Sequence, residues 1–212
     1  MKNSKQRDDA LAAEYGDRYE NSLKPTANAL REYFVDLVKA EPRIDRVTAR
    51  AKDPASFLKK ARALTDGKPK YSEPLVQIQD QIGARIITFY RADVDRLDDI
   101  IKSYFKTIEF RDRIPESEWE FGYFGRHYVL VLPSDVKSAA IDKSSLPEFF
   151  ELQVKTLFQH AWSEAEHDLG YKPGSIPLNS DQKRKLAYTS AQAWGADHMF
   201  DELFRARTAA KD

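Results

Sequence analysis

Residues 151–172 have the sequence ELQVKTLFQHAWSEAEHDLGYK and carry the strongest structural and chemical signal in the chain. The first six residues alternate polar and apolar side chains, which predicts a strand, and the following residues have the apolar spacing of a helix. Glu151, Gln153 and Lys155 therefore share one face of the strand. A carboxylate beside cations and aromatic rings at such a junction is a common arrangement for metal-assisted phosphoryl chemistry. The helix is expected to hold four more polar side chains near the end of the strand: Gln159, His160, Glu166 and His167.

The composition limits the classes of protein to which the chain can belong. Its 212 residues are enough for one domain with a full core. The 34 basic and 34 acidic side chains balance, so any site for a polyanion must be local. The absence of cysteine excludes disulfides, thiolate metal ligands and a cysteine nucleophile. No segment resembles a signal peptide or a membrane span, so we expect a cytoplasmic protein without a membrane partner.

Hydrophobic periodicity predicts an α+β fold, with a mixed sheet of about five strands flanked by helices. Without internal repeats or a second composition regime, residues 1–212 are expected to form a single domain. Its parts would be an N-terminal helical segment at 1–42, a core at 43–172 and a C-terminal helical segment at 180–212. The expected strands are 43–52, 83–90, 107–114, 127–132 and 148–156. The expected connections are helices at 53–64, at 94–105 and from 157, and loops at 67–72 and 134–147.

Cations are expected to converge on one spot after the first strand. Arg50 and Lys52 lie two residues apart and so share a face of that strand. Asp53, with proline after it, is expected to cap the next helix, which can bring Ser56 and Lys60 back to the same spot. Such a set of cations suits a triphosphate, although a solvated strand edge would explain it as well.

A second cluster, Asp80-x-x-Gly83-x-Arg85, leads into an apolar strand. An aspartate at the entry to a buried strand can hold a divalent cation, and a nearby glycine lets a nucleotide approach the backbone. A turn aspartate that binds the following backbone amides would explain the cluster equally well.

A third cluster, residues 122–127, has the sequence GYFGRH. Two glycines around aromatic residues predict an exposed loop on which a base can stack. Arg126 and His127 would then be available to a phosphate or a ribose. The alternative is a loop whose aromatic rings cover the edge of the sheet.

The order of these motifs resembles that of the RelA/SpoT synthetase family, the alarmone synthetases, over about residues 44–172. No phosphate loop of the Walker type and no dinucleotide fingerprint competes with this resemblance. The chain has no room for the hydrolase and regulatory domains of the long members, so it is similar to the small, synthetase-only members with their nucleotidyltransferase-like fold. The motifs are R-x-K-x-x-x-S-x-x-x-K from Arg50, D-x-x-G-x-R from Asp80, G-Y-x-x-x-H from Gly122, E-x-Q-x-K-T from Glu151 and W-x-E-x-E-H-x-x-x-Y-K from Trp162.

The resemblance implies transfer of the β,γ-pyrophosphate of ATP to the ribose 3′-hydroxyl of an acceptor nucleotide, with Mg²⁺ as the cofactor. It also implies that Asp80 and Glu151 bind the metal and that Glu151 receives the proton of the attacking hydroxyl. This chemistry needs charge neutralisation and in-line positioning, in agreement with the clusters above. The implied ATP site comprises Arg50 and Arg85 around the adenine and Lys52, Ser56 and Lys60 on the phosphates. The implied acceptor site comprises Tyr123, stacked on the base, with Arg126, His127, Gln153 and His160.

Three departures from the family pattern bear on the acceptor. Guanine-nucleotide synthetases often carry a Pro-Lys pair before the Gly-Tyr loop, whereas residues 118–121 are EWEF here, with Trp119 in place of the lysine. Gly125 replaces a usual serine, and His160 stands where small synthetases often place an asparagine that reads guanine. Glu118 and Glu120 would repel a triphosphate acceptor. Three arginines are candidates to compensate for this negative charge: Arg111, Arg113 and Arg126.

Three functions stay open on this evidence. The leading one is a small alarmone synthetase that makes (p)ppGpp from GDP or GTP. The second is a toxic small synthetase that pyrophosphorylates the 3′ end of tRNA or adenine nucleotides, in some cases beside an antitoxin protein. The third, a catalytically silent nucleotide-binding protein, is weakened because both carboxylates are present. A tRNA surface would comprise Lys68, Lys70, Lys183, Arg184 and Lys185, which also fit a solvated helix face.

The C-terminal helix leaves the state of assembly open. With exposed-looking Trp194 and Phe204, the helix from Ser180 would permit a homo-oligomer. Packing of the same helix within one chain is equally compatible with the pattern.

Overall fold

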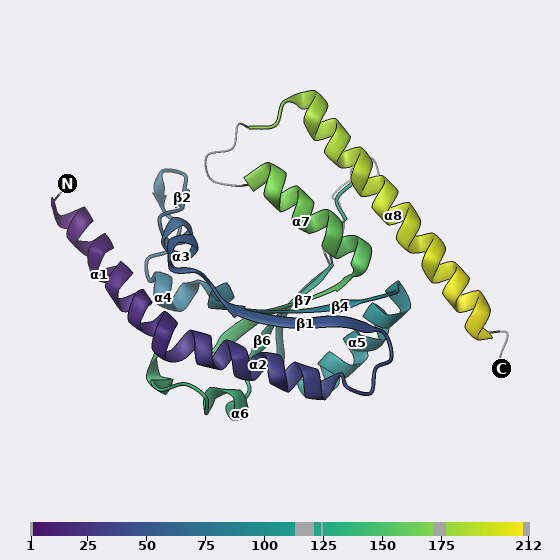
Figure 1. The fold of residues 1–212 in the computed structure, drawn as a ribbon. Coiled ribbons are helices and arrows are strands. Elements are labelled where there is room, and N and C mark those ends of the chain that lie inside the picture. Colours follow the sequence, from purple (N-terminus) through teal and green to yellow (C-terminus); the bar gives the residue numbers. More distant parts are fainter. Residues whose placement is uncertain (1, 113–120, 124, 172–176, 210–212) are drawn as a thin grey trace.

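The computed structural model describes residues 2–112, 121–123, 125–171 and 177–209 (Figure 1). A five-stranded sheet has the order β1-β4-β7-β6-β5, in which β4 and β7 run parallel and the other neighbouring strands antiparallel. This confirms the predicted mixed sheet, with each strand boundary within two residues of its expected position. The strands are β1 (Ile44–Ala51), β4 (Ile82–Thr88), β5 (Thr107–Asp112), β6 (Arg126–Val131) and β7 (Phe149–Thr156).

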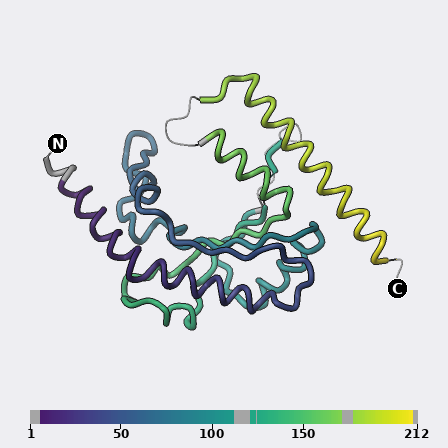
Figure 2. Tube along the Cα trace, viewed as in Figure 1, coloured from purple at the N-terminus to yellow at the C-terminus, as the bar shows by residue number. Residues whose placement is uncertain are grey.

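Helices cover both faces of the sheet and extend the chain to termini on opposite sides of the molecule (Figure 2). Among the described residues, no helix combines the length and the apolar character needed to span a membrane. The predicted N-terminal helix is interrupted by a π-helical turn and ends at Leu37. The helices are α1 (Lys2–Arg18), η1 (Tyr19–Leu23), α2 (Lys24–Leu37), α3 (Pro54–Ala61), α4 (Pro74–Gln77), η2 (Gln79–Gln81), α5 (Arg91–Tyr104), α6 (Ser134–Lys137), η3 (Lys143–Ser145), α7 (Leu157–Tyr171) and α8 (Ser180–Ala209).

The hydrophobic core lies between one face of the sheet and the helices α2 and α5. Phe34 of α2 stacks on Phe105 with their ring centroids 5.4 Å apart, and both rings contact Phe150 of β7. All three rings are buried. Because side chains alternate along a strand, the residues on either side of Phe150 face the other side of the sheet, where α7 and α8 lie (Figure 1).

Two connecting segments differ from the sequence prediction. The helix after β1 ends at Ala61, because β2 (Leu64–Thr65) pairs with β3 (Lys68–Pro69) in a short hairpin. Its turn residues Asp66 and Gly67 have φ values of 52° and 74°, the left-handed geometry that two-residue hairpins favour. The segment at 134–147, expected as a loop, contains α6 and η3.

The long helix α8 packs within the chain against α7 and the start of α5, one of the two alternatives that the sequence left open. Trp194 is 47% exposed, as expected. Phe204, expected to be exposed, instead stacks on Tyr90 with ring centroids 4.5 Å apart, and the Arg43 guanidinium lies over the same ring. Asp201 accepts a hydrogen bond from the Ala92 amide at 2.7 Å, which joins α8 to the start of α5.

Candidate active site

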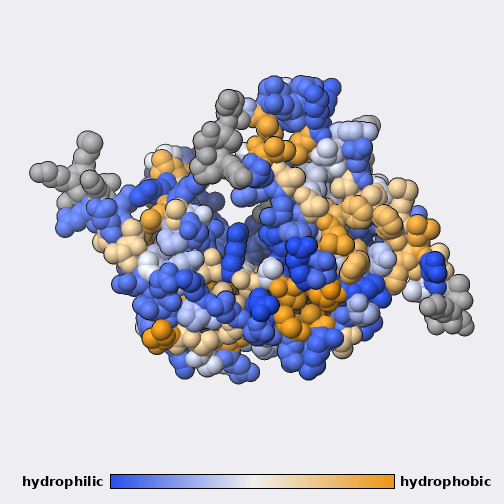
Figure 3. All heavy atoms as spheres, viewed as in Figure 1, coloured by the Kyte–Doolittle hydropathy of each residue, from blue (hydrophilic) through white to orange (hydrophobic). Residues whose placement is uncertain are grey.

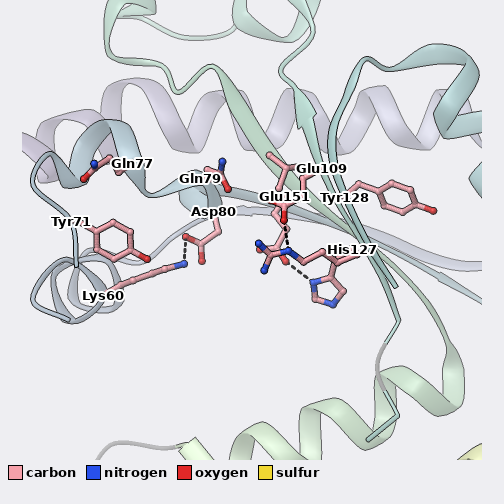
Figure 4. Close-up of a pocket in the computed structure, with 11 residues that line it drawn as sticks. Lys60, Tyr71, Gln77, Gln79, Asp80, Glu109, His127, Tyr128 and Glu151 are labelled. Carbon is pink, nitrogen blue, oxygen red and sulfur yellow. Dashed lines mark hydrogen bonds and ion pairs between the residues drawn. The ribbon is translucent and has the colours of Figure 1, made fainter. Parts of the chain in front are cut away.

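A cavity of about 180 Å³ brings together side chains from α3, from the segment between β3 and β4, and from the strands β5, β6 and β7 (Figure 4). In the space-filling view, the molecule is hollowed between α3 and α7, and mostly hydrophilic residues surround the hollow (Figure 3). The cavity is lined by Lys60, Tyr71, Gln77, Gln79, Asp80, Glu109, Arg111, His127, Tyr128, Val129 and Glu151.

Asp80 faces two lysines. Lys52 Nζ, at the end of β1, donates to Asp80 Oδ2 at 2.8 Å, and Lys60 Nζ of α3 lies 2.9 Å from Oδ1. Burial raises the pKa of Asp80, but the contacts with Lys52 and Lys60 outweigh burial and hold it below its usual range. The carboxylate is therefore ionised, and one negative charge meets two positive charges at the cavity wall.

Two local features bring these groups together. Asp53 accepts a hydrogen bond from the Ser56 amide at 3.0 Å, so the predicted cap of α3 is confirmed. The cap turns the chain at the end of β1, and α3 returns Lys60 towards the strand. The Lys52 amide donates to the Gln81 carbonyl at 2.8 Å, which ties the end of β1 to η2 and to the neighbouring Asp80.

Glu151 lies in the same cavity and is held by its strand neighbours (Figure 4). His127 Nδ1 is 2.8 Å from Glu151 Oε1, and Gln153 Nε2 donates to the same oxygen at 3.1 Å. Because an ionised carboxylate can only accept, Nδ1 of His127 must be the donor. Burial raises the pKa of Glu151, but the hydrogen bonds from His127 and Gln153 lower it to about 2. Glu151 is therefore ionised throughout the physiological range.

The two carboxylates fit a hard divalent cation. Asp80 Oδ1 is buried, and the contact found for it in the described part of the chain is the ion pair with Lys60 at 2.9 Å. Carboxylate oxygens are the ligands that Mg²⁺ prefers, and Mg²⁺ usually keeps several water or phosphate ligands. The described residues contain no group of three or more His, Asp or Glu side chains that could hold a metal. Asp80 and Glu151 would thus supply part of a coordination shell, as Mg²⁺ sites at phosphates require.

Arg85 and His160, expected in separate halves of the site, contact each other. Arg85 Nη1 donates to Glu164 Oε1 at 2.6 Å and lies 3.2 Å from His160 Nδ1. Because a guanidinium can only donate, Nδ1 accepts here and the imidazole is neutral. Burial and then the charge of Arg85 lower the pKa of His160, in agreement with a neutral ring. The three side chains link β4 to α7 beside the cavity.

Other polar groups at the strand-to-helix junction hold α7 in place. The Thr156 amide donates to Gln159 Oε1 at 3.0 Å, and the Gln159 amide donates to Thr156 Oγ1 at 3.1 Å. This reciprocal pair is a capping box. The buried Lys155 donates to Ser163 Oγ of α7 at 2.9 Å. Gln159 and Lys155 therefore stabilise the junction between β7 and α7.

Of the five residues expected around ATP, only Lys60 lines the cavity described above. Lys52 and Arg85 contact other residues of the site, as described above, whereas Arg50 and Ser56 are exposed. Arg50 is exposed on β1, where its backbone pairs with Gly83 of β4. Ser56 is exposed in the first turn of α3. Ser56 shares α3 with the cavity residue Lys60, and Arg50 lies on β1 two residues before Lys52.

Arg126, expected to bind the acceptor, points to the opposite face of the sheet. Its Nη2 donates to Asp95 of α5 at 2.6 Å, and its Nη1 lies 3.9 Å from Asp98. Because successive side chains of a strand alternate, Arg126 must face away from the cavity when His127 faces it. The structure therefore does not bring Arg126 to the acceptor side.

Tyr123 is covered by α8, and the expected exposed stacking loop is wrong for this structure. The side chain is 6% exposed, and its hydroxyl donates to the buried Asp197 of α8. Thr156 Oγ1 donates to the same carboxylate oxygen at 2.6 Å. Gly125 lets the loop lie close to β7, because a Cβ there would overlap the Val154 carbonyl oxygen. The residue of α8 that binds the Tyr123 hydroxyl, Asp197, is polar, so hydrophobic periodicity could not predict that it is buried there.

Several cavity residues were missed by sequence reasoning. Glu109 was not predicted, whereas Arg111 was named only as a candidate to compensate for acids at the acceptor. Both lie on β5 opposite β6 residues, so their period of two could have predicted a shared face. Tyr71, Gln77 and Gln79 lie between the hairpin and β4, where no pattern indicated a site. Several residues discussed from the sequence lie outside the described residues: Arg113, Glu118, Trp119, Glu120, Phe124 and Lys172.

Comparisons with known proteins agree with this geometry. Residues 49–175 match the family model of the region found in RelA/SpoT proteins. The chain is 32% identical over 166 residues to the GTP pyrophosphokinase YjbM of Bacillus subtilis (strain 168), covering 76% of this chain and 72% of the relative. The small alarmone synthetase 1 of Bacillus subtilis bound to its product pppGpp superposes with a TM-score of 0.69 at 25% identity, covering 90% of this chain and 98% of that one. A GTP pyrophosphokinase family protein from Streptococcus pneumoniae superposes with a TM-score of 0.68 at 25% identity, covering 87% and 90%.

Proposed function

The chain belongs to the RelA/SpoT family, and from this premise we propose that it transfers the β,γ-pyrophosphate of ATP to the 3′-hydroxyl of GDP or GTP, making (p)ppGpp. The family match and the relatives establish a pyrophosphokinase of the alarmone synthetase type, and the acceptor and the residue roles are the proposal. The observation that carries the proposal is the shared cavity of Asp80 and Glu151, with Lys60 and His127 in its wall.

On the donor side, Lys52 and Lys60 would hold the ATP phosphates. Their convergence on the Asp80 carboxylate supports this role, because it concentrates positive charge at one point of the cavity wall. Asp80 and Glu151 would hold Mg²⁺, which neutralises phosphate charge when it is bound. Ser56 would contact the phosphates from α3, and Arg50 and Arg85 would contact the adenine.

On the acceptor side, Glu151 would take the proton of the attacking hydroxyl. The hydrogen bonds from His127 and Gln153 to one of its oxygens fix the orientation of the carboxylate, as a general base requires. A carboxylate with a pKa of about 2 is a weak base, so the proton would move as the bond to phosphorus forms and the hydroxyl becomes acidic. His127, Gln153 and His160 would line the acceptor site.

A guanine acceptor is supported by the relative bound to pppGpp and by the relatives named as GTP pyrophosphokinases. Because Nδ1 of the neutral His160 ring accepts from Arg85, its proton lies on Nε2, which can donate one hydrogen bond to an acceptor atom of the base. Transfer to the 3′ end of tRNA or to an adenine nucleotide is the competing outcome that the assay must separate.

The proposal is tested by incubating purified protein with γ-³²P-labelled ATP and Mg²⁺ and separating the products by chromatography. Separate reactions contain GDP, GTP, AMP, ATP alone or deacylated tRNA as the acceptor. Label should pass to the guanine nucleotides. Label that passes only to tRNA or to an adenine nucleotide would overturn the proposed acceptor, and no transfer to any acceptor would overturn the proposed reaction for this chain.

The site is tested by Asp80→Asn, which removes the charge at the centre of the two lysines. We expect transfer to fall by at least ~10²-fold, because a carboxylate ligand for the Mg²⁺ that would neutralise phosphate charge is lost. The matched control is Asp36→Asn, which breaks the exposed Asp36–Lys39 pair at the end of α2 and should leave transfer unchanged. Far-UV circular dichroism establishes that both variants are folded. Transfer by Asp80→Asn at the wild-type rate would overturn the assignment of the site.

A further inference from the structure

Two side chains of α1 reach the backbone that carries the donor side of the site. The helix α1 lies beside α3 and α4 (Figure 1) and precedes the segment at 49–175 that matches the family model. Tyr15 and Arg18 are the residues involved, and neither was singled out by the sequence patterns.

Tyr15 connects α3 to the end of β1. Its fully buried ring stacks on Phe57 of α3, with centroids 3.7 Å apart and planes 4° from parallel. Its hydroxyl donates to the Lys52 carbonyl at 2.9 Å. Phe57 lies between Ser56 and Lys60 on α3, so a single side chain constrains the backbone positions of both lysines that contact Asp80.

Arg18 and Gln81 hold the segment that carries Asp80. Arg18 Nη1 donates to the Leu75 carbonyl at 2.9 Å and to Gln81 Oε1 at 3.2 Å. The fully buried Gln81 donates through Nε2 to the carbonyls of Leu75 and Ile78, at 2.8 and 2.9 Å. Its own carbonyl accepts from the Lys52 amide. The residue next to Asp80 is therefore tied to α1, α4 and β1.

Attaching α1 to the rest of the fold does not by itself require the hydrogen bonds of Tyr15, Arg18 and Gln81. Burying polar and charged groups is costly, and burial lowers the pKa of Arg18, so apolar residues would attach α1 with less penalty. Hydrogen bonds differ from apolar contacts because they are directional. Here one ends on Lys52 itself, one ends on Gln81 next to Asp80, and the others end on the carbonyls of Leu75 and Ile78 in the segment that leads to Asp80.

We propose that Tyr15 and Arg18 are positioning residues for the donor half of the site. They hold the backbone at Lys52 and Gln81 so that Lys52, Lys60 and Asp80 meet at the place of the ATP phosphates. This inference rests on the proposed function, because it takes these three groups to be the phosphate and metal site.

Tyr15→Phe is the sharpest test, because it keeps the ring on Phe57 and removes the hydrogen bond to Lys52. We expect the affinity for a non-hydrolysable ATP analogue with Mg²⁺ to fall about two- to tenfold, the range expected for the loss of one hydrogen bond. Arg18→Met removes the donors to Leu75 and Gln81 and should have a similar effect. In both variants, KM for ATP should rise while KM for the acceptor stays within about twofold.

The matched control is Ser22→Ala in η1 of the same N-terminal arm. The fully buried Ser22 hydroxyl donates to the Asp142 carbonyl at 2.7 Å, so this variant also loses one bond from a hydroxyl to a carbonyl. Asp142 lies outside the cavity lining, so the control should lower the melting temperature without changing affinity for the ATP analogue.

The measurements are calorimetric titration with the ATP analogue, melting temperature, and both KM values. Equal losses of melting temperature in Tyr15→Phe and Ser22→Ala, with wild-type affinity for the analogue in both, would overturn the inference. A wild-type protein that binds the analogue but transfers nothing would overturn the proposed function, and the comparison of binding between variants would still decide the inference.

Discussion

Replacing Glu151 by glutamine should change how the stability of the fold depends on pH. The ordinary pKa of a glutamate is 4.5, and that of Glu151 is about 2 in the folded protein. Because the folded-state pKa is depressed, the ionised carboxylate stabilises the fold. This contribution is fully present above pH 4.5 and is lost as the pH falls through the folded-state pKa. At ~1.4 kcal/mol per tenfold change in proton affinity, it amounts to roughly 3 kcal/mol.

The size of the effect follows from the partners of the side chain. Glu151 is 25% exposed and accepts two hydrogen bonds, from His127 and Gln153. Glutamine has nearly the same shape, can accept through its amide oxygen, and does not ionise. The difference in unfolding free energy between wild type and variant therefore isolates the titration of this one carboxylate from that of the others.

The assay is urea unfolding followed by circular dichroism at pH 7, 5, 4 and 3, with EDTA to exclude metal. The advantage of the wild type over Glu151→Gln should shrink by roughly 1 kcal/mol at pH 4 and roughly 2 kcal/mol at pH 3, relative to pH 7. A difference that stays constant over this range would refute the reasoning. It would mean that the hydrogen bonds from His127 and Gln153 do not favour the ionised form of Glu151.

Two further substitutions test the packing around the covered loop. Asp197→Ala leaves the buried hydroxyls of Tyr123 and Thr156 without their acceptor and should lower the unfolding free energy by about 2–4 kcal/mol in urea titrations, whereas Asp181→Ala at an exposed position of α8 should change it by less than about 0.5 kcal/mol. Gly125→Ala places a methyl group against the Val154 carbonyl and should lower stability by about 1–3 kcal/mol, while Gly195→Ala, which meets open space in α8, should raise it by up to about 1 kcal/mol; equal effects of the two alanines would contradict the close approach of the loop.

Local patterns predicted most of the fold and part of the site. The alternation of residues 148–156 placed Glu151 and Gln153 on one face of a strand, and the hydrogen bond between the two side chains confirms this. The same rule applied to β6 would have separated Arg126 from His127. The cap at Asp53 was also predicted correctly, because a cap depends on residues only three positions apart.

Contacts between distant segments could not be predicted in this way. Tyr123 and Asp197 are 74 residues apart, and their hydrogen bond depends on how α8 packs across the sheet. Glycines and aromatic residues at 122–127 fit an exposed loop and a covered loop equally well. The network of Tyr15, Arg18 and Gln81 has no sequence period, since the bonds from Tyr15 and Arg18 end on the Lys52 and Leu75 carbonyls and on the Gln81 side chain, 37 to 63 residues away.

The sequence by itself determined the order of strands and helices and the chemical character of the site, because periodicity and motif spacing are properties of neighbouring residues. The sequence also identified the RelA/SpoT family, because the combination of its motifs is specific although each motif alone is a weak indicator. The tertiary structure decided which of these groups meet: Lys52, Lys60 and Asp80 at one point, Glu151 with His127, Arg126 on the far face and Tyr123 beneath α8. The physical reason is that the order of strands in the sheet and the packing of helices on it depend on burial of the whole core. No short segment encodes that burial.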